Sequence, residues 1–302
     1  EDFLVETTSG TISSKYVINC AGLHADEVSS FVTGEKEYEI EAIKGEYFLL
    51  DKEEGDLVHH VIFQTPSKVG KGVLVTPTVH GNLLVGPNAL DTPFKDRVNV
   101  TSLGLDEVRR KASLTTDKID FSYNIRNFAG NRASIKGYDD FLIEESKVQK
   151  HFIHVAGIKS PGLSSAAAFG EEIVDILKRN GVPLERKQSY SYHPLPTFFK
   201  ELSLEEKEKK IKENSLYGRV ICRCETITEA EIVNAIHSLV GATTIDGVKR
   251  RCNAGMGRCQ GGFCSPKVFE ILQRETKRKY SEIYQDKEGS SVVLSRTKES
   301  KS

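Results

Sequence analysis

The sequence has no long apolar run. No stretch of its 302 residues approaches the roughly 18 consecutive apolar residues of a membrane-spanning helix, so it predicts no transmembrane segment. The start, EDFLVETTSG, has neither the basic segment nor the apolar core of a signal peptide. An excess of one charge is also missing, because the formal net charge is −1. We therefore expect no nucleic-acid partner, and other partners must be inferred from sites.

An initiator Met is absent as well, and the first residues have the pattern of a strand. We expect the chain to be a piece of a longer protein. Its 302 residues suffice for two domains of roughly 100–200 residues each. Charged residues make up 28% and hydrophobic residues 38%, which is typical of a globular protein.

Alternating strand-like and helix-like patterns run through about the first 185 residues. We expect a hairpin at the start, followed by a buried strand at 16–20. Further strands are expected at 44–50, 59–64, 72–76, 82–85, 140–144 and 152–156, and helices at 24–32, 103–114 and 164–179. This order predicts an α+β fold with a mixed, largely antiparallel sheet and part of an α/β layer.

The composition changes after residue 185. We expect a linker at 186–217, marked by Pro194 and Pro196 and containing a charged helix with a capping box of Ser203 and Glu206. A small all-α, cysteine-rich domain should follow at 218–280. The polar stretch 281–302 lacks periodicity, and we expect it to be disordered.

Five of the six cysteines lie in the last third of the chain. Without a secretion signal, such a group predicts a metal or cluster site more than a disulfide framework. Two close pairs stand out: Cys222 with Cys224, and Cys259 with Cys264. One and four residues separate the partners, whereas zinc knuckles usually have two, so the spacing favours an iron–sulfur cluster over zinc. Zinc remains the alternative.

Residues around these cysteines suit the same chemistry. Glycines near the second pair allow the backbone to turn N–H groups toward sulfur. Arginines at 219, 223 and 258 would add to this effect if they faced inward. The segments ICRCETIT and VKRRCNAGMGRCQGGFCSP resemble the bacterioferritin-associated ferredoxin-like [2Fe–2S] domain over about 218–279. The resemblance implies that a [2Fe–2S] cluster is held by Cys222, Cys224, Cys259 and Cys264, and it leaves Cys252 as a spare thiol.

A second motif, HVAGIKSPGLSSAAAFG, occupies 154–170. A strand runs into a Gly/Ser/Pro turn and then into a helix rich in small residues. Helix starts carry free N–H groups and partial positive charge, so this one could stabilise the negative charge of a reduced flavin. A helix start with close packing and no ligand explains the motif about as well.

Together with VINCAGLHAD, IKGEYFLLD, NFAGNRAS and YDDFLIEES, this motif is similar to the D-amino-acid-oxidase-like FAD superfamily over about 1–185. Within that superfamily it most resembles the glycerol-3-phosphate dehydrogenase branch, in the form that carries the ferredoxin-like tail. The resemblance implies a substrate-domain sheet plus the remnant of an α/β FAD domain. It also implies that Arg132 binds the anionic group of the substrate. The implied flavin contacts are Ala21, Gly22, Gly157, Ile158, Lys159, Ser160, Pro161, Gly162 and Leu163.

The FAD fingerprint G-x-G-x-x-G after a first strand is absent. We therefore expect this chain alone to bind FAD weakly or not at all. Other candidates remain open: Arg126 as a second anion contact, residues 44, 46 and 47 on the substrate face, and a catalytic base among the histidines at 59, 60 and 80. Cys20 should be a small residue closing a buried strand.

The resemblance implies an enzyme that oxidises sn-glycerol 3-phosphate, a small anionic hydroxy substrate, to dihydroxyacetone phosphate. L-2-hydroxyglutarate is the alternative substrate, and a non-catalytic electron-transfer module is the alternative function. Electrons would pass from FAD, with the [2Fe–2S] cluster as a further carrier, to a membrane-associated subunit or a quinone-linked acceptor. We expect a cytoplasmic location, or a peripheral one at the inner face of the membrane.

Overall fold

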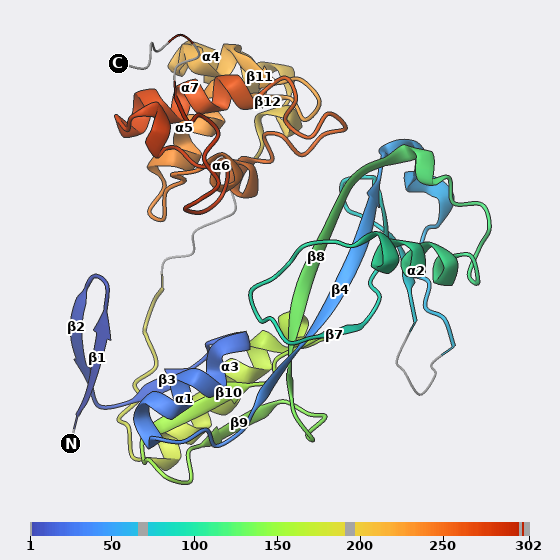
Figure 1. The fold of residues 1–302 in the computed structure, drawn as a ribbon. Helices are drawn as coiled ribbons and strands as arrows, with labels where there is room; N and C mark the ends of the chain where they lie inside the picture. The colour runs from blue at the N-terminus through green and yellow to red at the C-terminus, as the bar shows by residue number, and fades with distance from the viewer. Residues whose placement is uncertain (1, 66–71, 191–196, 296–297, 299–302) are drawn as a thin grey trace. The chain divides into compact units, whose positions relative to one another are not determined.

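The computed structural model describes residues 2–65, 72–190, 197–295 and 298. The chain divides into two compact units, Glu1–Ser189 and Tyr190–Ser302, and each is described by itself. Figure 1 shows the first unit as two joined sheets with helices and the second as a cluster of short helices. The prolines at 194 and 196, expected in the linker, lie outside the described residues.

The first sheet of the first unit is small, and its central strand is buried. Strand β10 (Phe152–Ala156) pairs parallel with β3 (Val17–Asn19) and antiparallel with β9 (Leu142–Glu145). Helices α1 (Ala25–Thr33) and α3 (Gly162–Arg179) pack on this sheet (Figure 1). All five residues of β10 are buried, as the interior of a sheet covered by helices requires. A hairpin of β1 (Phe3–Thr7) and β2 (Gly10–Ser14) precedes it.

The second sheet is wholly antiparallel in its named pairings, in the order β5-β6-β4-β7 with β8 also paired to β4. Its long ladder runs from Ile40 opposite Ile135 to Leu50 opposite Asn124. Helix α2 (Ser102–Ala112) packs against β4 and β6, and Val108 and Ala112 enter the core there. The strands are β4 (Ile40–Leu50), β5 (Leu74–Pro77), β6 (Leu83–Gly86), β7 (Leu90–Thr92) and β8 (Asn124–Ile135).

The α+β prediction with a largely antiparallel sheet is confirmed, although two details differ. The sequence NIRNFAGNRASI was not expected to form a strand, because it is polar and rich in Asn and Gly, yet it forms β8. Its pairing with β4 along eleven positions overrides the weak propensity. Conversely, the strand expected at 59–64 is wrong, because that stretch makes only an isolated bridge between Ile62 and Val75.

Short helices build most of the second unit. A two-stranded ladder of β11 (Val220–Cys222) and β12 (Ile227–Thr228) accompanies them. The capping box of Ser203 and Glu206 opens α4, and a second one, of Thr228 and Glu231, opens α5. The helices are α4 (Leu204–Glu213), α5 (Glu229–His237), α6 (Ile245–Cys252) and α7 (Ser265–Thr276).

A continuous apolar core joins these helices, and both cysteine loops reach it. Cys222 and Cys264 are buried there with Ile227, Ile232 and Leu272. The same core extends into the stretch that we expected to be disordered. Ile283 is fully buried, and Tyr284 and Ser291 form an antiparallel bridge.

Several 3-10 turns connect the elements. In the first unit they are η1 (Gly22–His24), η2 (Lys52–Leu57) and η3 (Phe121–Tyr123), and in the second η4 (Phe199–Glu201), η5 (Ser215–Gly218) and η6 (Tyr280–Glu282). Across the described ranges, no helix combines the length and the apolar character needed to cross a membrane.

Candidate functional site

Most of the flavin contacts expected from the sequence, all except Ala21 and Gly157, line one open pocket of about 760 Å³ in the first unit, together with Arg132. Residues from three distant segments line it, around positions 22, 132 and 160. Of the described residues in its lining, two are cationic, Arg132 and Lys159, and none is acidic. The lining is Gly22, Leu23, Asn131, Arg132, Ala133, Ile158, Lys159, Ser160, Pro161, Gly162, Leu163 and Ser164. The pocket therefore favours an anionic ligand.

The turn from β10 into α3 forms one side of this pocket. Gly157 has a φ of +68°, and a Cβ there would lie 2.9 Å from Ile135, so the tight turn requires glycine. Helix α3 starts after Pro161, and no described side chain caps it. An uncapped helix start presents backbone N–H groups and partial positive charge, here at the wall of the pocket. This arrangement suits the negatively charged part of a flavin ring.

Lys159 and Leu163 extend this wall. Nζ of Lys159 donates to Oγ of Ser134 at 3.2 Å, which ties the turn to the end of β8. Leu163 is 95% exposed on the first turn of α3, an unusual place for a large apolar side chain. Ala21, also expected near the cofactor, comes directly before the lining residue Gly22.

Arg132 lies on strand β8, in a stretch rich in Gly and Asn for which the sequence predicted no strand. Its position is opposite Ile43 of β4. Its Nη2 donates to the backbone carbonyl of Asn88 at 3.4 Å. A strand residue is held more rigidly than a loop residue, so its guanidinium is well placed to bind phosphate or carboxylate.

The neighbour of Arg132, Asn131, anchors the segment 94–97. Its Nδ2 donates to the backbone carbonyls of Phe94, Lys95 and Arg97 at 3.2, 2.8 and 3.2 Å. Nζ of Lys95 in turn donates to the fully buried carboxylate of Asp26 at 2.6 Å. This chain of contacts links β8 to helix α1.

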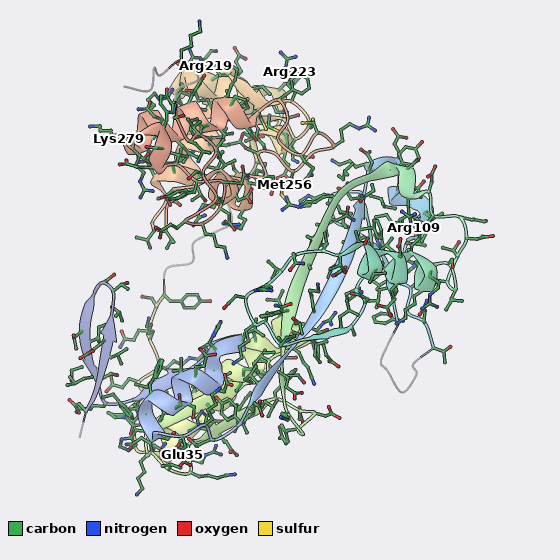
Figure 2. The ribbon with its side chains drawn as sticks, in the orientation of Figure 1. Glu35, Arg109, Arg219, Arg223, Met256 and Lys279 are labelled. Atoms are coloured by element: carbon green, nitrogen blue, oxygen red, sulfur yellow. The ribbon has the colours of Figure 1, made fainter. Side chains whose placement is uncertain are left out.

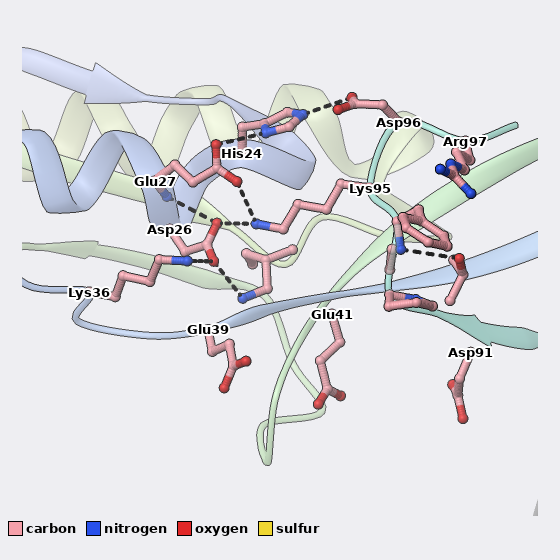
Figure 3. A pocket seen from close by; sticks show the side chains of 15 residues that line it. His24, Asp26, Glu27, Lys36, Glu39, Glu41, Asp91, Lys95, Asp96 and Arg97 are labelled. Atoms are coloured by element: carbon pink, nitrogen blue, oxygen red, sulfur yellow. Dashed lines mark hydrogen bonds and ion pairs between the residues drawn. The ribbon is translucent and has the colours of Figure 1, made fainter.

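Figure 3 shows Asp26 at the centre of a charged cluster. Besides Lys95, its carboxylate accepts from Nζ of Lys36 at 3.0 Å and from the backbone N–H of Ile40 at 3.2 Å. Burial opposes ionisation of Asp26, but these three donors outweigh it and lower its pKa to about 2. His24 bridges Glu27 and Asp96 at 3.1 and 3.0 Å. No sequence motif predicted this cluster, since its members come from three separate segments.

A buried polar network surrounds His154 on β10, the central strand of the small sheet. His154, 1% exposed, contacts Glu37 through Nε2 at 2.9 Å and the hydroxyl of Tyr38 through Nδ1 at 3.3 Å. Asn19, its partner on β3, donates to the backbone carbonyl of Ala25 at 2.7 Å. These bonds fix the end of β10 three residues before Gly157, and so they hold the pocket's turn in place.

Of the residues expected on the substrate face, only Tyr47 shares the face of Arg132. Side chains alternate along a strand, so Lys44 and Glu46 point to the other face, where they form a buried ion pair at 2.7 Å. Glu46 also accepts from the hydroxyl of Thr101 at 3.1 Å. Their role is therefore to attach the 99–101 segment to the sheet.

The remaining sequence candidates lie outside the pocket. The histidines at 59, 60 and 80 are exposed, and none is part of its lining. Arg126 lies on the same face as Arg132 but six residues away on β8, about 20 Å along a strand. Cys20 is exposed, so the expectation that it closes a buried strand is wrong: β3 ends at Asn19 and the chain then turns toward the surface.

The four cysteines of the second unit come together as two facing pairs. Sγ of Cys224 donates to Sγ of Cys259 at 3.8 Å. The thiol of Cys264 donates to Cys222, and this bond lowers the pKa of Cys222 to about 6 against the effect of burial. The same bond and burial raise the pKa of Cys264. Cys252, in contrast, is buried apart from them, and burial raises its pKa to about 12.

Backbone N–H groups point at these sulfurs. Those of Gly255 and Glu225 hydrogen-bond Cys222, and that of Phe263 bonds Cys259 and lowers its pKa. Gly257 passes so close to Cys224 that a Cβ would lie 2.2 Å from the Cβ of that cysteine. The glycines thus let the backbone approach sulfur, as the sequence predicted.

The arginines expected to add to this effect are exposed. Arg219 is 65% exposed and pairs with Glu229 at 3.2 Å, and Arg223 points outward (Figure 2). Within the described residues, no group of three or more His, Cys, Asp or Glu side chains forms a preformed metal site. Two thiol pairs with backbone N–H donors fit a [2Fe–2S] cluster, because such a cluster takes two thiolates on each iron.

Comparison with known families matches the first unit to the FAD dependent oxidoreductase family over residues 1–176. The chain belongs to this family. The FAD dependent oxidoreductase match includes every residue of the first-unit pocket, from Gly22 to Ser164. Residues 220–274 match the BFD-like [2Fe-2S] binding domain, which includes all four paired cysteines. Both resemblances inferred from the sequence are confirmed.

Two proteins named as glycerol 3-phosphate dehydrogenases are similar to the chain over very different lengths. A glycerol 3-phosphate dehydrogenase of Caloramator mitchellensis is 51% identical over 298 residues, which are 98% of this chain and 62% of that protein. One subunit of the anaerobic glycerol-3-phosphate dehydrogenase of Escherichia coli is 34% identical over 64 residues, 21% of this chain and 12% of that protein. The chain thus spans less than two thirds of either relative.

A solved structure supports the fold. An L-alpha-glycerophosphate oxidase from Mycoplasma pneumoniae, with FAD bound, superposes with a TM-score of 0.55 and 28% identity. The match covers 62% of this chain and 49% of the oxidase chain.

Proposed function

We propose that the full protein oxidises sn-glycerol 3-phosphate to dihydroxyacetone phosphate. The observation that carries the proposal is one pocket in which Arg132 lies with the turn 158–163 and no acidic residue. The 51% identity to a protein named glycerol 3-phosphate dehydrogenase supports the same substrate. That relative also makes the alternative, L-2-hydroxyglutarate, the less supported one.

The chain's own residues have distinct roles in this proposal. The guanidinium of Arg132 binds the phosphate, because its planar fork of donors matches phosphate oxygens. The turn 157–163 and the uncapped start of α3 hold one face of the flavin and favour negative charge there. Bound FAD would supply the acceptor for the hydride, which carries both electrons away from the alcohol carbon, while the hydroxyl proton would go to a base.

The second unit would conduct electrons onward. We propose that Cys222, Cys224, Cys259 and Cys264 hold a [2Fe–2S] cluster, because their sulfurs lie in facing pairs with backbone N–H donors. We propose a membrane-associated subunit or a quinone-linked acceptor as the final partner, with the protein at the inner face of the membrane. The likeness to one subunit of a larger dehydrogenase supports a partner protein of this kind.

Anaerobic mixing of the full-length, FAD-loaded protein with substrate tests the activity. Glycerol 3-phosphate should reduce the flavin after mixing and thereby bleach its visible absorption. L-2-hydroxyglutarate should do so far more slowly. If neither compound reduces the flavin, the proposal is wrong. Titration of this chain alone with FAD measures its affinity for the cofactor. Because the G-x-G-x-x-G fingerprint is absent, we expect weak binding, and tight stoichiometric binding would contradict this expectation.

A further inference from the structure

The paired cysteines of the second unit have a buried side and an exposed side. Cys222 and Cys264 lie in the apolar core, whereas Cys224 is exposed and Cys259 is partly exposed. The sulfurs of Cys224 and Cys259 lie 3.8 Å apart. A cluster held by the four thiolates would therefore reach the surface of the second unit at the Cys224–Cys259 pair.

Two large apolar side chains are exposed beside this pair. Phe263 is 88% exposed, although its own backbone N–H binds the sulfur of Cys259. Met256 is 38% exposed, and the backbone of the glycines on both sides of it touches the paired cysteines. Exposed aromatic and methionine side chains are typical of surfaces that bind another protein.

The exposed charges next to the same pair are positive. Arg223, between two of the cysteines, and Lys267, in the first turn of α7, are both exposed. Neither makes an ion pair or a hydrogen bond with a residue that the structure describes. The stretch 247–269 contains five Lys or Arg residues and no Asp or Glu.

The nearby carboxylates do not compensate this charge. Glu225, directly after Cys224, is only 6% exposed and pairs with Lys200 at 3.4 Å. Glu270 is exposed, but it lies one turn of α7 beyond Lys267 and further from the cysteines. The surface at the cysteine pair therefore attracts negative charge, over about 8 Å at physiological salt.

We propose that this cysteine face, formed by Arg223, Met256, Phe263 and Lys267, docks an acidic partner protein that accepts electrons. The inference rests on the proposed [2Fe–2S] cluster and specifies the partner of the proposed function. The partner places an apolar patch on Phe263 and carboxylates near the two cations, because opposite charges speed the encounter and a desolvated ring holds the complex. Each encounter transfers one electron from the cluster to the partner's redox group, and no bond or proton is exchanged.

Two other occupants fit this face less well. A second copy of the chain would bring the same cations against one another, since a two-fold interface pairs a surface with itself. An anionic membrane would match the charge, but lipids accept no electrons, and two apolar side chains make a weak anchor. The exposed cysteine pair at the centre of the face therefore favours a redox protein.

Electron transfer from this chain to two haem proteins of opposite charge tests the inference. The chain is loaded with its cluster, reduced with dithionite and mixed in a stopped-flow instrument with cytochrome b5, which has an acidic surface, or with cytochrome c, which has a basic one. The rate constant for cytochrome b5 should fall as salt is added, because salt screens the attraction. The rate constant for cytochrome c should rise.

Lys267→Glu should lower the rate constant for cytochrome b5 at low salt about threefold or more, because it reverses one charge of the face. Glutamate suits the first turn of a helix, so the variant should fold and keep its iron and sulfide. Arg278→Glu is the matched control, since it makes the same change beyond the far end of α7. Figure 2 shows the neighbouring Lys279 on the opposite side of the second unit from Arg223 and Met256. The control should change the rate constant by less than about 1.5-fold.

Phe263→Ala tests the apolar part of the face. It should lower the rate constant for cytochrome b5 about twofold or more even at high salt, where the charges are screened. Leu294→Ala is its control, because Leu294 is 85% exposed in a stretch that is attached to the start of α6 and not to the cysteine loops. The control should leave the rate constant unchanged.

The outcomes separate this inference from the proposed cluster. A chain that holds iron and sulfide, but whose rate constants respond neither to salt nor to Lys267→Glu and Phe263→Ala, overturns the docking face and leaves the cluster standing. Self-association of the chain, or its binding to phosphatidylglycerol vesicles, would also overturn it if Phe263→Ala abolished that binding without changing the rate constants. A chain without a cluster after anaerobic reconstitution overturns both.

Discussion

The carboxylate of Asp26 on helix α1 accepts a hydrogen bond from Nζ of Lys95 at 2.6 Å, although 69 residues separate the two in the sequence. Lys95 belongs to the segment that Asn131 holds through three backbone carbonyls. Asn131 and Arg132 are adjacent on β8, so this ion pair connects helix α1, next to the pocket's Gly22 turn, with the strand that carries Arg132, the arginine proposed to bind the substrate's anionic group.

Asp26→Asn should destabilise the chain by about 2 kcal/mol at pH 7, because the lowered pKa of Asp26 measures how strongly the fold prefers its carboxylate. The native pKa lies below the unfolded one, so this stability is complete above about pH 5 and disappears as the pH falls toward 2. Urea unfolding at several pH values measures it. Asp96→Asn is the control, since Asp96 is 79% exposed and should cost under about 0.5 kcal/mol. A wild-type advantage that stayed constant from pH 7 to pH 2 would contradict the assignment.

Glu46→Leu should destabilise by about 3–5 kcal/mol, because it leaves the ammonium of Lys44 buried without its partner. The double variant Lys44→Met with Glu46→Leu should recover most of this loss, since it removes both charges. Thermal unfolding of the single and the double variant measures how much of the loss comes from the unpaired charge. Equal losses in the single and the double variant would show that packing against Gly104, and not the charge, dominates at this position.

Arg132→Lys should raise the KM for glycerol 3-phosphate about 10- to 100-fold in the full-length enzyme, because lysine cannot form the paired donors of a guanidinium. Stability should change little, since the hydrogen bond of Arg132 to the carbonyl of Asn88 is long. Arg179→Lys, on the exposed end of α3, is the matched control. If KM is unchanged and kcat alone falls, Arg132 does not bind the substrate's anionic group.

Cys222→Ser and Cys259→Ser should each abolish cluster assembly, because each removes one ligand from a facing pair. Iron and sulfide assays, together with the visible spectrum of chain purified without oxygen, measure the loss. Cys20→Ser and Cys252→Ala should retain about two irons and two sulfides per chain, since neither thiol faces the pairs. Stoichiometric zinc in place of iron in the unaltered chain, even after anaerobic reconstitution, would remove electron transfer from the second unit.

Local patterns in the sequence identified most helices and the cysteine site. The capping box of Ser203 and Glu206 and the apolar spacing in α2 depend on residues three or four apart, so they can be read without the fold. The two cysteine pairs are likewise close in sequence, and the glycines that bring N–H groups to sulfur lie between them. The turn between β10 and α3 was found in the same way, from one continuous motif.

Long-range pairing decided the rest. Strand β8 has a polar, glycine-containing sequence, and only its ladder with β4 makes it a strand. That ladder in turn decides which side chains share a face: it puts Tyr47 with Arg132 and sends Lys44 and Glu46 to the opposite side. The sequence alone thus determined the local helices, the positions of the two cysteine pairs and the turn proposed to contact the flavin. Only the tertiary structure determined the shape of the substrate face, because strand register and ion pairs such as Asp26 with Lys95 depend on residues that meet only when the chain has folded.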